Sequence, residues 1–158
     1  MTSRRDALRA VLALGGALAG PRSSAARDYR AAAEVLDTID GLAARVEASL
    51  DAIVRVVPGA APFAASVRAD HVREQGGRDA IRARLRLPSP VRSTLPAPST
   101  SLGALRALQQ DLVHAHAEGL PALDDEAAVQ ALARHMVEAA RRLTVIDLWI
   151  DVEAERAG

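Results

Sequence analysis

The chain has 158 residues, of which 49% are hydrophobic, 25% charged and 2% aromatic, and its formal net charge is zero. This length and composition are typical of one globular domain. Cysteine is absent and all 20 basic residues are arginine. Disulfides, thiolate metal sites and reactions that need a lysine are therefore excluded. One Phe, one Trp and one Tyr are too few for a platform on which single-stranded nucleic acid stacks.

Residues 1–26 have the pattern of an export signal. Arg4 and Arg5 come first, an apolar run without charge covers residues 10–20, and small residues follow it. This order resembles a twin-arginine (Tat) signal peptide, and the run is too short to span a bilayer. We therefore expect a protein exported to the periplasm or another extracytoplasmic space, which does not span the membrane once the signal is removed.

Apolar residues recur every three or four positions along residues 27–57, which predicts a long amphipathic helix. A proline and a glycine at 58–59 end this helix. A second helix is predicted over residues 60–87. The two glycines at 76–77 predict a kink or a break in it, because glycine disfavours the helical conformation.

Residues 88–98 contain four prolines and are expected to form an extended connection. A third helix is predicted over 99–119, with a serine or threonine as its cap, and a fourth over 125–155. No segment has the alternation of a strand. We therefore predict an all-α fold for residues 27–158, an antiparallel four-helix bundle in which the proline-rich connection joins two helical hairpins.

Four polar residues on or near the predicted apolar faces are candidate metal ligands: His71, Glu74, His116 and Glu138. His71 and Glu74 are three residues apart, as are His135 and Glu138, so each pair shares a helix face and could chelate a metal. Two features favour a different interpretation. No carboxylate lies on the apolar face of the first helix, and Arg141 follows Glu138 by three residues, which favours an ion pair. His71, Glu74 and Arg78 would then form a buried polar cluster.

The long connection between two hairpins, the Asp70-His71 segment and residues 112–121 before the last helix together resemble the ferritin-like domains of exported bacterial proteins. The resemblance implies a metal site in the bundle, built from a Glu on each of two helices and a Glu-x-x-His motif on each of the others. This chain has the reverse order, His-x-x-Glu, at two places. The resemblance therefore implies a degenerate metal site.

Charge is distributed unevenly along the chain. Residues 68–92 hold seven arginines and three acidic residues, whereas residues 124–158 hold four arginines and eight acidic residues. These helices either attract each other or have solvated charged faces. The alternative is that the arginine-rich helix binds a phosphate, a carboxylate or an acidic partner.

Without residues 1–26 the chain has 16 basic and 19 acidic residues, and this net charge of −3 disfavours binding to nucleic acid. We therefore expect a non-enzymatic binding or interaction protein without a cofactor, whose partner is an unidentified protein or small ligand. The alternative is a ferritin-like protein that binds iron or manganese for a redox or storage role. The two functions make different predictions for the structure: metal binding requires that the four candidate ligands lie close together inside the bundle.

Overall fold

The computed structural model describes residues 29–90 and 97–157, so the expected signal peptide and part of the proline-rich connection lie outside the described residues. All regular structure in the described part is helical. The long helices are α2 (Tyr29–Val56), α3 (Ala61–Leu85), α4 (Leu102–Gly119) and α5 (Glu126–Ala157), and single turns of 3-10 helix form η2 (Pro58–Ala60) and η3 (Leu120–Ala122). The predicted all-α fold with four helices is confirmed.

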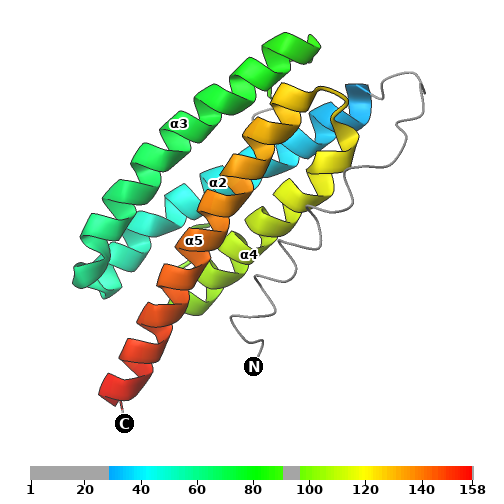
Figure 1. Cartoon of the computed structure of the whole chain (residues 1–158). Coiled ribbons are helices and arrows are strands. Elements are labelled where there is room, and N and C mark those ends of the chain that lie inside the picture. Colours follow the sequence, from blue (N-terminus) through cyan, green and yellow to red (C-terminus); the bar gives the residue numbers. More distant parts are fainter. Residues whose placement is uncertain (1–28, 91–96, 158) are drawn as a thin grey trace.

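The four helices lie side by side along a common direction, and the last turns of α5 extend beyond the others (Figure 1). Helix α4 packs most extensively, against α5 and α2. Helix α3 packs mainly against α2, and its contacts with α5 are sparse. One flank of the molecule, between α3 and α5, is therefore less tightly packed than the rest.

Polar contacts between successive long helices follow a reversed order. Along α2 and α3, Asp51 pairs with Arg68, whereas the earlier Asp37 pairs with the later Arg82. Along α4 and α5, Arg106 pairs with Asp147, whereas Gln109 donates to the carbonyl of Ala139. This order is what two helical hairpins would produce.

Local sequence explains where the helices begin and end. The hydroxyl of Ser101 accepts a hydrogen bond of 3.2 Å from the amide of Ala104 and caps the N-terminus of α4. The carboxylate of Asp125 accepts one of 2.9 Å from the amide of Ala128 and caps the N-terminus of α5. Arg86 has a φ of 55°, a left-handed conformation that ends α3. Helix α3 is unbroken through Gly76 and Gly77, so the break expected there is wrong. Contacts with the other helices on both sides of the two glycines offset their low helix propensity.

The apolar residues form two separate hydrophobic clusters. The first includes Ile39, Ile81, Leu112, Leu132 and Ala139, and the second includes Val46, Val67, Leu108 and Ile146. Complete burial of one large aliphatic side chain stabilises the fold by about 1.5–3 kcal/mol, so the two clusters supply most of the stabilisation. Helices α3, α4 and α5 carry buried polar residues in the segment between their contacts with the first cluster and those with the second. None of the described helices is both long and apolar enough to cross a membrane.

Candidate functional site

Seven polar side chains gather between and beside the two hydrophobic clusters, and we call this group the polar layer. Its members are His71, Glu74 and Arg78 on α3, Gln109 and His116 on α4, and His135 and Arg142 on α5. All of them except His135 are at least nine-tenths buried. A buried polar group is costly unless it has a partner, so the contacts of these side chains decide what the layer can do.

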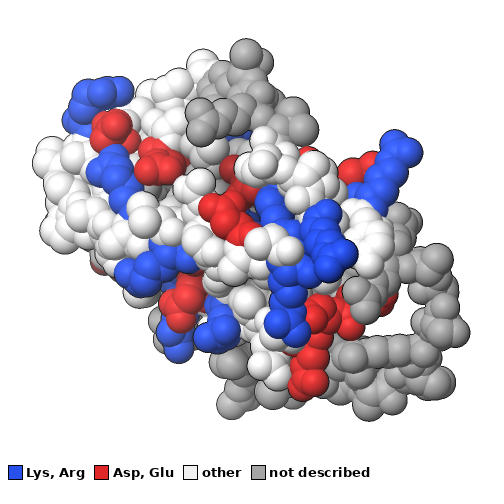
Figure 2. Space-filling model, turned by 90° about the horizontal axis from the view of Figure 1, so that it is seen from above, with Lys and Arg blue, Asp and Glu red and all other residues white. Residues whose placement is uncertain are grey.

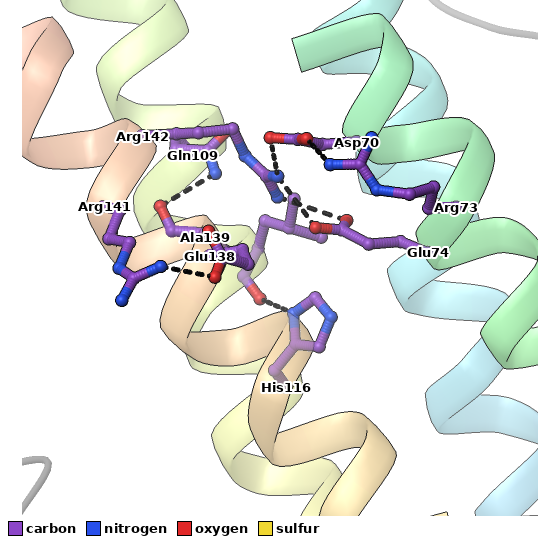
Figure 3. A network of polar contacts seen from close by, with 10 residues as sticks. Asp70, Arg73, Glu74, Gln109, His116, Glu138, Ala139, Arg141 and Arg142 are labelled. Carbon is purple, nitrogen blue, oxygen red and sulfur yellow. Dashed lines mark hydrogen bonds and ion pairs between the residues drawn. The ribbon is translucent and has the colours of Figure 1, made fainter. Parts of the chain in front are cut away.

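A two-pronged ion pair crosses the layer from α5 to α3. The Arg142 Nη1 and Nη2 atoms donate to the two carboxylate oxygens of Glu74, over 2.7 and 3.2 Å (Figure 3). Both side chains are only 5% exposed. Asp70 lies at the edge of this pair, 3.5 Å from Arg142, and also pairs with the exposed Arg73. The only carboxylate inside the layer is therefore already bound by a guanidinium.

Two further arginines of α3 are neutralised by α2. Arg78 donates through Nε to Asp40, and Arg82 donates to Asp37 and Asp40 over 2.8 and 2.9 Å. Both arginines are buried, whereas the two aspartates lie at the edge of the packed face. The arginine-rich helix thus pairs chiefly with the first helix, while the acidic fourth helix contributes an arginine, Arg142, to α3.

Three histidines, each from a different helix, converge on the layer. The rings of His116 and His135 meet edge to face, with centroids 6.2 Å apart. Burial, and to a lesser extent the charges of Arg142 and Arg78, lower the pKa of His71 to about 3. Burial likewise lowers the pKa of His116 to about 4 and that of His135 to about 4, and both arginines contribute in each case. All three imidazoles are therefore neutral near pH 7.

One hydrogen bond assigns the tautomer of His116. Its Nδ1 lies 2.6 Å from the carbonyl oxygen of Leu112, and a carbonyl can only accept, so Nδ1 carries the hydrogen. Because the ring is neutral, Nε2 presents a bare lone pair. That atom is buried and has no hydrogen-bond partner in the described structure.

Other buried nitrogens of the described residues also lack a hydrogen-bond partner. They are both ring nitrogens of His71, Nη1 of Arg78, Nε of Arg82, Nδ1 of His135 and Nε of Arg142. Leaving a buried donor or acceptor without a partner costs about 1–3 kcal/mol. Six of the seven unpaired nitrogens, counting Nε2 of His116, belong to the polar layer, which therefore has unused hydrogen-bonding capacity.

A groove of about 730 Å³ between α3 and α5 leads to the layer. Glu74, Gly77 and His135 line its inner part, and Arg73, Arg134 and Arg141 are among its exposed lining residues. A Cβ atom at Gly77 would lie 2.7 Å from Cε1 and 2.8 Å from Nε2 of His135. Glycine at this position therefore lets the imidazole pack against the backbone of α3.

The structure brings three of the four candidate ligands into one layer. His71, Glu74 and His116 are buried there, but Glu138 is 44% exposed and pairs with Arg141 over 2.6 Å. Among the described residues, no group of three or more His, Asp or Glu side chains is arranged to hold a metal ion. The described residues thus do not supply the ligands of a ferritin-like di-metal centre, because Arg142 binds the carboxylate of Glu74.

Sequence reasoning did not single out Arg142, although a signal for it exists. Arg142 follows the buried Ala139 by three residues and precedes the buried Ile146 by four, which places it on the packed face of α5. An arginine at such a position needs a buried acidic partner. The structure identifies that partner as Glu74.

No protein-family model, curated protein or solved structure matches this chain. The polar layer and the groove beside it are therefore the features of the described residues that bear on function. The polar layer offers buried nitrogen donors, one bare imidazole nitrogen and a paired carboxylate, and its residues Glu74 and His135 line the groove.

The two adjacent glycines of α3 provide a test of this geometry. Replacing the exposed Gly76 by Ala meets nothing within 4 Å, so we expect Gly76→Ala to stabilise the fold by about 0.5–1 kcal/mol through helix propensity. Gly77→Ala gains the same propensity but must displace the His135 ring, so it should be less stable than Gly76→Ala by about 1 kcal/mol or more. Urea denaturation measures both values. Equal stabilisation by the two variants would contradict the placement of His135.

The buried histidines also predict a dependence of stability on pH. Their folded pKa values lie below the ordinary value of 6.5, so the unfolded chain binds protons that the folded chain cannot accept. Their contribution to the free energy of unfolding is fully present above about pH 6.5. It is lost progressively as the pH decreases toward about 4. We expect the free energy of unfolding to decrease less steeply with falling pH in His71→Gln than in the native chain. His114→Gln, which replaces an exposed histidine of α4, is the control and should keep the native slope. A native slope in His71→Gln would overturn the account.

Proposed function

We propose that this protein is an exported, ferritin-like antiparallel four-helix bundle with a degenerate metal site, and that it acts by binding rather than by catalysis. The observation that carries this proposal is the buried ion pair between Glu74 and Arg142. A guanidinium supplies there the positive charge that a metal ion would otherwise supply to the carboxylate.

Electrostatics argues against a resident cation in the layer. A di-metal site in a bundle is built from several carboxylates, but Glu74 is the only carboxylate of this layer. Burial, followed by the charges of Arg78 and Arg142, disfavours positive charge on the three imidazoles, as the lowered pKa values of the histidines indicate. The same burial and the two nearby guanidinium groups would also oppose a divalent cation in the layer.

The helix order supports the ferritin-like part of the proposal. Two hairpins are joined by a long connection, α3 to α4, and contacts within each hairpin run in reverse order. The polar layer lies within the bundle between two apolar clusters, and bundle metal sites are also built from side chains of facing helices in the core. A lost metal site that has kept its polar character would have this arrangement.

The remaining parts of the proposal concern location and partners. The twin-arginine-like pattern of residues 1–26 supports export. Arginines and acidic side chains are interspersed on the face seen in Figure 2, without a broad basic area. This distribution, with the net charge of −3 calculated without residues 1–26, disfavours nucleic acid as a partner and favours a small ligand or another protein.

A second candidate function, binding of iron or manganese, is favoured by His116. Its Nδ1 is oriented by a backbone carbonyl and its Nε2 is bare, as is usual for metal-binding histidines. His71 and Glu74 would be the other nearby donors. This candidate ranks second because Glu74 is already paired.

Elemental mass spectrometry tests the proposal against this alternative. Protein produced from the full chain and purified without chelators should contain no stoichiometric iron, manganese or zinc, and should not take up added Fe²⁺ or Mn²⁺. We expect Arg142→Glu, which adds a carboxylate beside Glu74 and removes the guanidinium, to gain metal binding if it folds. Arg141→Glu alters the neighbouring exposed residue and is the matched control, with no gain. Stoichiometric metal in the native protein, lost in the double variant His71→Ala/Glu74→Ala, would refute the proposal.

A further inference from the structure

The outer face of α5 leaves large apolar side chains in contact with solvent. Of the six large hydrophobic residues that are exposed in the described structure, three lie on this helix: Val137, Leu148 and Val152, which are 37%, 48% and 41% exposed. They are separated by eleven and by four residues, close to three turns and one turn, so they share one side of the helix. An aligned set of this kind favours a surface that a partner covers.

Charged residues on the same face are segregated along its length. Arg134 and Arg141 lie in its first half, Asp151 and Glu155 lie in its second half, and all four are exposed. Arg141 pairs with Glu138 of its own helix, whereas the other three make no ion pair with any described residue. The outer face of α5 is therefore basic toward one end and acidic toward the other.

This pattern complements itself when two copies of α5 run in opposite directions. Residues 137 and 152 are equally far from the midpoint between residues 144 and 145, and so are residues 134 and 155. A two-fold axis at this midpoint therefore places valine against valine and arginine against glutamate, and each contact occurs twice. A parallel pair would place arginine against arginine and carboxylate against carboxylate, which repel each other.

The shape of the molecule leaves room for this arrangement. The last turns of α5 extend beyond the other helices (Figure 1), so its acidic end projects from the bundle. At the other half of the face, Arg134, Val137 and Arg141 line the groove of about 730 Å³ between α3 and α5. The exposed Arg73 lines the same groove from α3. The acidic end of one copy thus fits a groove that three arginines line.

We propose that two copies of this chain associate through α5 in an antiparallel, two-fold symmetric dimer, in which the acidic end of each α5 lies along the arginine-lined groove of the other copy. Contact between Val137 and Val152 of the second copy supplies apolar burial, and Leu148 packs against the aliphatic part of Arg141. The ion pairs set direction and register more than affinity, because exposed pairs contribute little. This inference goes beyond the proposed function and holds whether or not the polar layer binds a metal.

Sedimentation equilibrium of the full chain tests the association. We expect a mass that rises with concentration toward twice that of one chain. The variants Arg134→Glu/Arg141→Glu and Asp151→Arg/Glu155→Arg should each associate about tenfold more weakly or worse, because each places like charges against one another. An equimolar mixture of the two variants should recover the association, because an acidic face then meets a basic one.

A control variant separates this contact from a general effect of charge. Arg45→Glu/Arg55→Glu makes the same change of net charge as the arginine variant of α5. It alters exposed residues of α2, a helix that does not pack against α5. This control should associate as the native chain does. A monomer at every concentration, native association of both α5 variants, or no recovery in their mixture would overturn the dimer.

Disulfide cross-linking tests the direction of the two helices, because the chain has no cysteine of its own. A mixture of Val137→Cys and Val152→Cys should form a disulfide-linked dimer in aerated buffer, whereas each variant alone should form little. Both positions are exposed, so neither change should affect the fold. Efficient cross-linking of either variant with itself, or none in the mixture, would refute the antiparallel arrangement.

Discussion

The desolvated ion pair between Glu74 and Arg142 is the interaction on which the attachment of α3 to α5 depends. In the middle of α3, the residues that face the bundle are a histidine, a glutamate and an arginine, so hydrophobic burial cannot hold this part of the helix. Two hydrogen bonds to one carboxylate do so instead. Removing one partner of such a pair leaves an uncompensated buried charge and costs about 3–5 kcal/mol.

This pair also explains the position of α3 along its neighbours. The polar layer is bordered by two apolar clusters, so a shift of α3 by one helical turn would place Glu74 against aliphatic side chains. Asp40, which binds both Arg78 and Arg82, restricts the same helix from the side of α2. Charge pairing therefore selects one register, and the sparse packing between α3 and α5 leaves the groove that Glu74 and His135 line.

The fold could be predicted from the sequence more completely than the site. Apolar residues spaced by three and four residues marked three of the helices and the two ends of α3, because this spacing follows directly from helix geometry. The expected break at Gly76–Gly77 did not occur, since the cost of glycine is small compared with the contacts on either side of it. A buried polar cluster of His71, Glu74 and Arg78 was among the interpretations of the sequence, but Arg142 was not foreseen, because pairing between helices depends on their mutual rotation, which periodicity alone does not give. The exposed position of Glu138 reflects the same rotation.

A double-mutant cycle on Glu74 and Arg142 tests the central claim most directly. Glu74→Gln and Arg142→Met each remove one charge with little change of volume, and urea denaturation gives the free energy of unfolding of both variants and of their combination. The account predicts that the combined variant is more stable than the sum of the single losses implies, with a coupling energy of about 1.5 kcal/mol or more. Losses that add to within about 0.5 kcal/mol would contradict it, because the two residues would then act independently.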